Sequence, residues 1–93
     1  MSEIHPVRYS QYVYVLKSCK DNHFYVGYTS DINKRIKEHQ LGEVISTKNR
    51  RPLRLVYCEI GLSQKDAITR EKYLKTAWGK RYIKNRIKNY LKD

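Results

Sequence analysis

The stretch YVYVLKSCKDNHFYVGYT, residues 12–29, decides the fold of this chain. In residues 12–18 and again in residues 23–29, the side chains alternate with a period of two, as they do on a pleated strand. The Asp-Asn pair between the two runs favours a turn, so the sequence predicts an antiparallel hairpin. On this hairpin Tyr14 and Tyr25 fall across from one another to within a residue or two. They can share a ligand if they face the same side.

A short helix is expected directly after the hairpin. Ser30 or Asp31 offers an N-cap, and Ile32 and Ile36 repeat at the i, i+4 spacing of one helix face. Gly42 supplies the glycine that commonly ends a helix. The segment should therefore form about three helical turns, which need tertiary packing to be stable.

Residues 52–60, PLRLVYCEI, predict a third strand. Alternate residues of a strand face opposite sides of the sheet, and here both sides carry some apolar residues, which indicates a strand inside the sheet. Ser63 caps a second predicted helix, whose buried stripe runs from Ala67 to Trp78 and which is expected to end at Gly79. A last helix follows, with an apolar side that contains Ile83, Ile87, Tyr90 and Leu91.

The predicted order is strand, strand, helix, strand, helix, helix. This order is typical of an α+β fold with a three-stranded antiparallel or mixed sheet flanked by helices. The 93 residues, 40% of them hydrophobic, suffice for one modest core. We expect a loose N-terminal arm over residues 1–9 and a single domain over residues 10–93.

The charge of the chain indicates a polyanionic partner. Twenty Lys and Arg residues against nine Asp and Glu residues give a net charge of +11. Nucleic acid is the first expectation and an anionic membrane surface the second, ahead of a basic surface that only keeps the protein in solution. The sequence has no apolar run that could span a bilayer and no signal-peptide pattern, so a cytoplasmic location is expected.

Glu71 lies on the predicted buried stripe of the second helix, at i+4 from Ala67 and i−3 from Leu74. A buried carboxylate is costly unless it pairs with a cation, accepts hydrogen bonds or binds a metal. The sequence supports a salt bridge to Arg35 and a metal site equally.

Arg35 and His39 are one turn apart on the first helix and border its apolar edge. They are either part of a solvated charged face or aimed across the sheet, and the sequence weighs these two interpretations evenly. Together with Tyr14, Tyr25 and Glu71 they would suit phosphodiester hydrolysis. Arginine binds a phosphate oxygen, one carboxylate can hold Mg²⁺, and an activated phenol or imidazole can move a proton.

At these residues the sequence resembles the GIY-YIG nuclease superfamily, in particular its small free-standing members. The resemblance covers roughly residues 10–80 and extends to the nuclease domain of the nucleotide excision repair incision subunit. The matching segments are YVY (12–14), YVG (25–27), SDINKRIKEH (30–39), RRPLRLVYCE (50–59) and AITREKYLK (67–75).

The resemblance implies a metal-dependent endonuclease that cuts DNA with little sequence specificity, in DNA repair or recombination. It would make Tyr14, Tyr25, Arg35, His39 and Glu71 the catalytic residues. Glu71 would be the sole protein ligand of one divalent ion, Mg²⁺ or Mn²⁺. It also implies a three-stranded sheet flanked by helices, and a glycine at position 27 that lets the backbone come close to the substrate.

Two positions depart from the family pattern. Tyr12 stands where the family has glycine, and Tyr28 stands where some repair members have a lysine near the scissile phosphate. The contact made by that lysine is either missing here or supplied by another basic residue, for which Lys48, Arg50 and Arg51 are the candidates. The full set of expected nucleic-acid-binding residues is Gly27, Lys48, Arg50, Arg51, Lys80, Arg81 and Lys84.

Two other functions are consistent with the sequence. The chain could be a nucleic-acid-binding module that keeps the fold without turnover, although such a module has no evident use for a carboxylate beside phosphate. It could also be an adaptor whose basic last helix binds an acidic protein.

Overall fold

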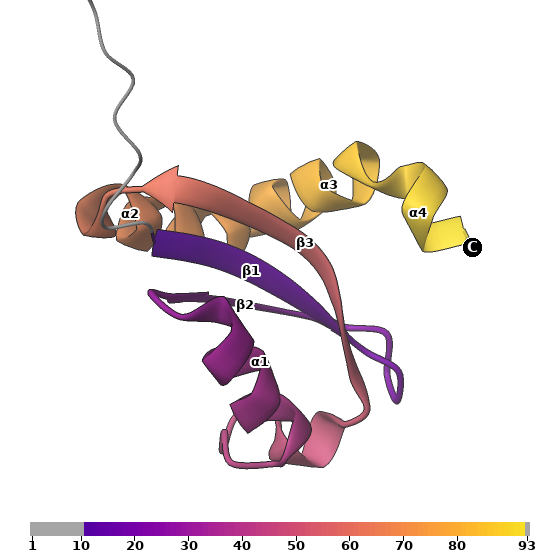
Figure 1. Ribbon diagram of the computed structural model, residues 1–93. Coiled ribbons are helices and arrows are strands. Elements are labelled where there is room, and N and C mark those ends of the chain that lie inside the picture. The colour runs from indigo at the N-terminus through magenta and orange to yellow at the C-terminus, as the bar shows by residue number, and fades with distance from the viewer. Residues whose placement is uncertain (1–10, 93) are drawn as a thin grey trace, which may run out of the picture.

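The computed structural model describes residues 11–92 of the chain. The expected N-terminal arm, residues 1–9, lies outside the described residues. The elements follow one another as β1 (Gln11–Ser18), β2 (Phe24–Thr29), α1 (Ile32–Gln40), the 3-10 turn η1 (Lys48–Arg50), β3 (Leu53–Leu62), α2 (Gln64–Leu74), α3 (Ala77–Arg86) and α4 (Lys88–Lys92) (Figure 1). The α+β class and the hairpin predicted from the sequence are confirmed.

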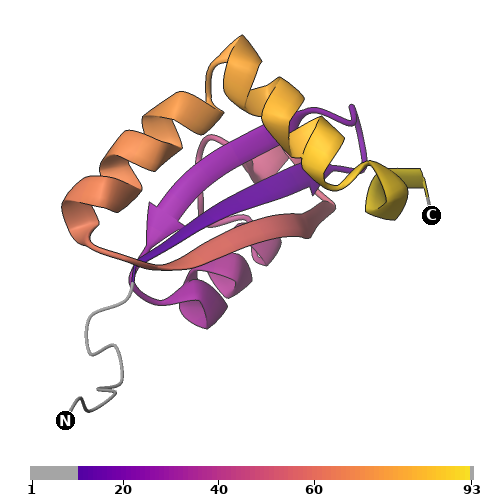
Figure 2. The same cartoon turned by 90° about the horizontal axis from the view of Figure 1, so that it is seen from above.

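The three strands form an antiparallel sheet in the order β2-β1-β3, so β1 lies in the middle (Figure 2). The prediction that the third strand is internal was wrong. β3 is an edge strand, and several of its apolar side chains face solvent, Ile60 among them at 65% exposed. Apolar residues occur at both alternating positions of β3, yet only some of them are covered. Val56 belongs to the buried core, whereas Leu55 and Ile60 are exposed.

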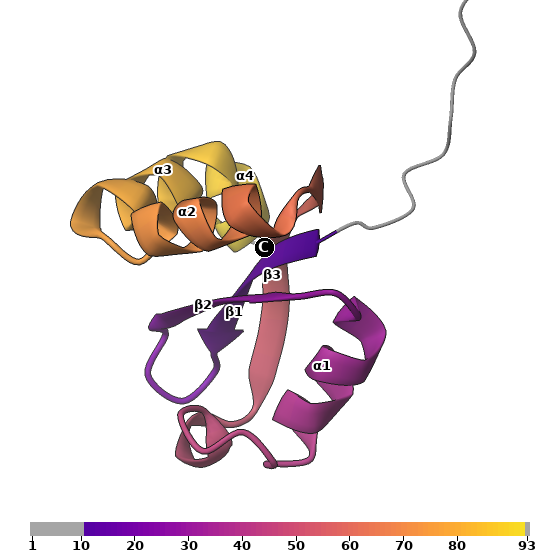
Figure 3. The same ribbon diagram turned by 90° about the vertical axis from the view of Figure 1, so that its left-hand side faces the viewer.

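The sheet separates two helical layers. α1 lies against one face, and α2, α3 and α4 lie on the other side (Figure 3). Val13 and Val15 of β1 are fully buried toward the core, whereas Tyr14 and Leu16 are fully buried on the opposite face. The buried core cluster consists of Val13, Val15, Val26, Val56, Ala67, Leu74 and Ile83.

An ion pair with aromatic neighbours fastens β3 to the helices. The Arg70 guanidinium donates to both carboxylate oxygens of Glu59, with distances of 2.8 and 2.9 Å, and the Tyr57 hydroxyl donates to Glu59 at 2.7 Å. The guanidinium also lies 4.8 Å from the ring centre of Tyr82 and 5.4 Å from that of Tyr73. Because Arg70 binds Glu59 through two parallel hydrogen bonds, the pair fixes the orientation of the two side chains as well as their distance.

The predicted boundary of the second helix was wrong. α2 ends at Leu74, and Thr76 starts α3 by accepting a hydrogen bond from the Gly79 backbone N–H. Trp78 therefore belongs to α3 and is 67% exposed, with the Arg81 guanidinium 4.9 Å from its ring centre. Gly79 does not end a helix but is buried where α3 passes the end of α2.

The predicted last helix is interrupted as well, since α3 ends at Arg86 and α4 begins at Lys88. No helix within residues 11–92 has the length and apolar character needed to cross a membrane.

Substituting Gly79 by alanine should destabilise the fold. A Cβ atom at this position would collide with the Tyr73 carbonyl oxygen and the Leu74 backbone, which cannot move as a flexible side chain would. We expect Gly79→Ala to lower the free energy of unfolding by about 1–3 kcal/mol in urea denaturation, despite the better helix propensity of alanine. The exposed neighbour Lys80→Ala is the control and should change stability by less than about 0.5 kcal/mol. Equal stability of the two variants would contradict the close packing at Gly79.

Candidate active site

The phenol of Tyr14 crosses the neighbouring strand at Gly27. The two residues are paired in the β1–β2 register, and Tyr14 is only 1% exposed. A Cβ atom on Gly27 would lie 2.5 Å from the Tyr14 hydroxyl oxygen and 2.6 Å from the ring carbon that carries it. The glycine is therefore required by the Tyr14 ring, which occupies the space above it. Whether Gly27 also approaches a nucleic acid stays a prediction.

Tyr25 joins Tyr14 on the same face of the sheet. It pairs with Leu16 rather than with Tyr14, so the two tyrosines are diagonal neighbours, two residues away from direct opposition. Their ring centres are 6.4 Å apart. The ring of His39 meets both of them edge to face, 5.6 Å from Tyr14 and 5.2 Å from Tyr25. The hairpin thus brings the two phenols together, as expected.

His39 reaches these rings from the last turn of α1. Asp31 starts this helix by accepting a hydrogen bond from the Lys34 backbone N–H, which confirms one of the two predicted caps. The imidazole is 1% exposed and shares a 2.9 Å hydrogen bond between Nε2 and the Tyr14 hydroxyl. Its Nδ1 shares a 2.7 Å hydrogen bond with the hydroxyl of Thr47, which is fully buried. Sequence reasoning missed Thr47, because a loop residue carries no periodic signal.

Burial dominates the electrostatics of the site. It raises the pKa of Tyr14 to about 12; the nearby Tyr25 and Glu71 act in the same direction, while the Arg35 guanidinium opposes the rise. Burial also lowers the pKa of His39 to about 4, and the positive charge of Arg35 adds to this effect. Near pH 7 the imidazole is therefore neutral, and the Tyr14 phenol keeps its proton unless a ligand or cation stabilises the phenolate.

Arg35 and Glu71 do not pair with one another. The Arg35 guanidinium donates to Glu38 at 3.0 Å, and 36% of the Arg35 side chain is exposed. The Glu71 side chain is 17% exposed, and its recorded ion pair is a 3.6 Å contact with Lys75, which is 54% exposed. The salt bridge considered from the sequence is thus absent from the described structure, and Glu71 has only a long, solvent-screened ionic contact.

The carboxylate of Glu71 suits a single, loosely held divalent ion. Residues 11–92 contain no group of three or more His, Cys, Asp or Glu side chains that could enclose a metal. Mg²⁺ keeps several of its waters and is often bound through one or two carboxylates, whereas structural zinc requires four protein ligands. A single carboxylate such as that of Glu71 is compatible with an ion of this kind, and its role as a metal ligand stays a prediction.

Five of the six basic residues expected to bind nucleic acid line two cavities whose linings do not include Tyr14 or Tyr25; the sixth, Arg81, lies over the ring of Trp78 instead. Lys48 and Arg51 line a cavity of about 750 Å³ together with Lys20, which sequence reasoning had not singled out. Arg50, Lys80 and Lys84 line a second cavity, which lies beside the turn of the hairpin. That second cavity, of about 340 Å³, is lined by Asn22, His23, Phe24, Arg50, Lys80 and Lys84.

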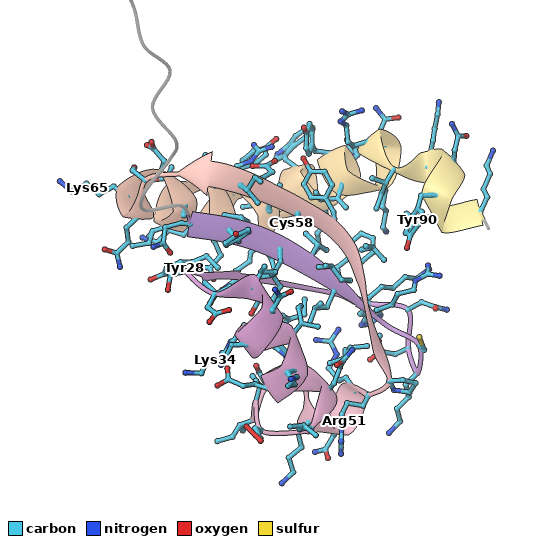
Figure 4. The ribbon with its side chains drawn as sticks, in the orientation of Figure 1. Tyr28, Lys34, Arg51, Cys58, Lys65 and Tyr90 are labelled. Carbon is cyan, nitrogen blue, oxygen red and sulfur yellow. The ribbon has the colours of Figure 1, made fainter. Side chains whose placement is uncertain are left out.

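Tyr28 shares a cavity with two cations of α1. A cavity of about 300 Å³ is lined by Tyr28, Lys34 and Arg35 among others, and Tyr28 and Lys34 lie on the same side of the molecule (Figure 4). Lys48 and Arg51, two candidates for the missing lysine, line a different cavity. Lys34, interpreted from the sequence as part of a solvated face, is thus the lysine that shares a cavity with Tyr28.

Comparison with known protein families identifies the family to which the chain belongs. A family model described as the GIY-YIG catalytic domain matches residues 10–88. The chain belongs to the GIY-YIG family. The two triplets that resemble the GIY and YIG motifs lie on the paired strands β1 and β2, and the segments with Arg35 and Glu71 lie on α1 and α2.

The chain is also similar to several UPF0213 proteins of bacteria. It is 47% identical over 66 residues to UPF0213 protein SH2523 of Staphylococcus haemolyticus, covering 70% of this chain and 79% of the relative. It is 42% identical over 67 residues to UPF0213 protein YazA of Bacillus subtilis, covering 71% of this chain and 67% of the relative.

A solved structure shares the fold. The solution NMR structure of UPF0213 protein BH0048 from Bacillus halodurans matches with a TM-score of 0.50 and 36% sequence identity. The match covers 80% of this chain and 81% of that one. The three-stranded sheet flanked by helices is thus shared with a sequence relative.

The crossing of Tyr14 over Gly27 can be tested by a double-mutant cycle. Gly27→Ala should lower the free energy of unfolding by about 1–3 kcal/mol, because the new methyl group displaces the phenol from its hydrogen bond with His39. In a Tyr14→Ala background the same substitution should cost at least about 1 kcal/mol less, since the ring is gone. Urea denaturation of the four proteins measures the coupling. An equal cost in both backgrounds would show that the ring does not require the glycine.

Proposed function

We propose that this chain is a divalent-metal-dependent endonuclease that hydrolyses phosphodiester bonds in DNA with little sequence specificity. The observation that carries the proposal is the convergence of Tyr14, Tyr25 and His39 beside Arg35, with the charge of Glu71 acting on Tyr14. Membership of the GIY-YIG family supports the same chemistry. We further propose that the activity serves DNA repair or recombination in the cytoplasm.

Arg35 is the residue suited to bind the phosphate. Its guanidinium is planar and permanently charged, and its side chain is 36% exposed, so a phosphate oxygen can reach it. The present partner, Glu38, is 30% exposed and lies one turn away on the same helix. A partly exposed ion pair of this kind contributes little stability, so its exchange for a phosphate costs little.

A phenol would act on the attacking water, and Tyr14 is better placed than Tyr25 for this role. The Arg35 guanidinium favours the Tyr14 phenolate, against the burial that disfavours it. Hydrogen bonding to His39 fixes where the Tyr14 oxygen lies. Tyr25 then shapes the site by packing against the imidazole.

Glu71 would hold the divalent ion, Mg²⁺ or Mn²⁺. When bound, such an ion neutralises charge that develops on the phosphate and on the leaving oxygen. Glu71 lies on α2, directly after Arg70. The ion pair of Arg70 with Glu59 holds this part of the helix against β3. Its contact with the exposed Lys75 is weak enough to be replaced.

Affinity would come from phosphate contacts rather than from reading bases. The net charge of +11 and the basic residues around the cavities favour binding along the DNA backbone. Sequence-independent binding of this kind has a Kd of roughly 10⁻⁴ to 10⁻⁶ M and weakens steeply with salt. Little sequence specificity is therefore expected.

The nuclease activity is tested by cleavage of labelled duplex, single-stranded and branched DNA with Mg²⁺ or Mn²⁺. Tyr14→Phe and Glu71→Gln should each slow cleavage by at least about a hundredfold, because one removes the phenol and the other the metal-binding charge. EDTA should abolish cleavage by the wild type. Tyr90→Phe and Glu43→Gln are the matched controls, since both side chains belong to exposed residues outside the site, and they should cleave at the wild-type rate.

The outcome also separates this function from its alternative. If the wild type does not cut any of these substrates, but binds DNA with a steep salt dependence shared by all variants, the chain is a non-catalytic nucleic-acid-binding module. The family fold would then be kept for binding alone.

The cavity at the hairpin turn should contribute to binding and not to turnover. Lys84→Ala removes one cation from this cavity and should reduce the slope of log K against log salt concentration by about one, measured by fluorescence anisotropy on labelled duplex. Lys65→Ala removes the same charge at the far end of α2 (Figure 4) and should leave the slope unchanged. Equal effects of the two variants would show that the net charge, and not this cavity, determines binding.

A further inference from the structure

The exposed aromatic side chains of residues 11–92 all lie on the helices of one layer. They are Tyr73 on α2, Trp78 and Tyr82 on α3, and Tyr90 on α4. These helices lie on the opposite side of the sheet from α1, which carries Arg35 and His39 (Figure 3). The exposed rings are therefore separate from the cluster of Tyr14, Tyr25 and His39.

A guanidinium accompanies each of these rings at a distance typical of cation–π contacts. The distances from guanidinium carbon to ring centre are 5.4 Å for Arg70 and Tyr73, 4.8 Å for Arg70 and Tyr82, 4.9 Å for Arg81 and Trp78, and 5.3 Å for Arg54 and Tyr90. Arg70 joins Tyr73 to Tyr82, and Trp78 lies one turn before Tyr82 on α3. Tyr73, Tyr82 and Trp78 thus form one aromatic strip across α2 and α3.

Trp78 keeps a free face although Arg81 lies over its ring. Tryptophan is highly buried on average, yet Trp78 is 67% exposed with the guanidinium in place. A guanidinium over a ring covers one of its two faces, and covering both would leave far less of the residue accessible. The other face of the indole is therefore open to a flat ligand.

The strip lies in a positively charged part of the chain. Residues 72–92 contain eight Lys and Arg residues and no Asp or Glu. Arg70 is neutralised by Glu59, so the free charge at the strip comes from Arg81. Lys80 and Lys84 of the same helix line the cavity at the hairpin turn. A polyanion with flat, apolar parts would complement this surface.

Unpaired nucleic acid has the chemistry that this surface recognises. Its bases stack on aromatic rings, and its phosphates bind cations. In a duplex the base faces are stacked on one another and cannot be reached by a ring on the surface of a helix. A membrane surface fits less well, because a helix that lies in it needs a broad apolar face. On α3 Ile83 is fully buried, which leaves Trp78 and Tyr82 as the exposed apolar side chains.

We propose that Tyr73, Tyr82 and Trp78 form a stacking surface for unpaired bases of a single-stranded nucleic acid, with Trp78 as the main contact and Arg81 as a phosphate ligand. The proposal rests on the proposed function in one respect, that the partner is nucleic acid, and does not require cleavage. Stacking tolerates every base, so it is consistent with little sequence specificity.

The fluorescence of Trp78 tests the contact directly, because Trp78 is the only tryptophan of the chain. The full chain is titrated with a short oligothymidylate, with a blunt duplex, and with a base-free deoxyribose-phosphate strand that has as many phosphates as the oligothymidylate. Stacking on a base quenches an indole, so the oligothymidylate should quench the emission strongly at saturation and the other two should not. Equal quenching by the base-free strand would overturn the proposal.

Affinities measured by anisotropy on labelled strands test the energetic role of the ring. Trp78→Ala should weaken oligothymidylate binding roughly five- to hundredfold, as expected for the loss of one stacked base. The slope of log K against log salt concentration should not change, because no charge is removed. Trp78→Phe keeps a ring and should retain most of the affinity. Ile45→Ala, at a residue that is 91% exposed in the loop after α1, is the control and should bind as the wild type does.

The base-free strand separates stacking from charge in the same variants. Trp78→Ala should bind it as tightly as the wild type does, whereas Arg81→Gln should bind both strands more weakly. An unchanged affinity of Trp78→Ala for oligothymidylate, or an equal loss for both strands, would overturn the proposal.

The outcomes also distinguish this surface from the nuclease function. If the wild type cuts no DNA but binds single strands through Trp78, the nuclease function fails and the stacking surface stands. If the wild type cuts DNA and Trp78→Ala binds single strands equally well, the surface fails and the nuclease stands. A blue shift of Trp78 emission on phosphatidylserine vesicles, without quenching by oligothymidylate, would assign the strip to a membrane surface and overturn the proposal.

Discussion

The crossing of the Tyr14 ring over Gly27 is the constraint on which the rest of the site depends. Because β1 is the central strand, its alternating residues serve both layers: Val13 and Val15 fill the core, and Tyr14 faces α1. The phenol can reach His39 only because β2 carries no side chain where the ring passes. The same glycine therefore allows the strand pairing and the hydrogen-bonded site to coexist.

On the other face, the ion pair between Arg70 and Glu59, which lies away from Tyr14 and Tyr25, limits the directions open to the side chain of Glu71. Successive residues of a helix point about 100° apart, so Arg70 and Glu71 cannot face the same way. The bidentate contact of Arg70 with Glu59 holds that part of α2 against β3. Glu71 therefore points in a different direction from Arg70, and its charge acts to raise the pKa of Tyr14. The contact of Arg70 with Glu59 and the direction of the Glu71 side chain are thus coupled by helix geometry.

Features with a local or periodic signal could be predicted from the sequence. The hairpin and the placement of Tyr14 beside Tyr25 follow from period-two alternation, and α1 follows from its Asp31 cap. The position of β3 at the edge could not be predicted, because a half-covered edge strand can carry the same apolar pattern as an internal one. The exposure of Trp78 was missed because the break between α2 and α3 rests on a Thr76 cap inside a continuous helical pattern.

Thr47 could not be identified from the sequence for a different reason. It matters only through its contact with His39, which lies eight positions earlier and on a helix, whereas Thr47 lies in a loop.

The charged residues are distributed unevenly between the site and the rest of the surface. The site itself is nearly neutral, with an uncharged imidazole, two phenols, an arginine paired with Glu38 and one carboxylate, whereas much of the excess positive charge lies around the cavities outside it. A strongly basic site would favour phosphate in the ground state and the transition state alike, which raises affinity without accelerating the reaction. If the chain is the nuclease proposed above, placing the cations elsewhere would leave Arg35 and a metal ion held by Glu71 to respond to charge that develops only as the bond breaks.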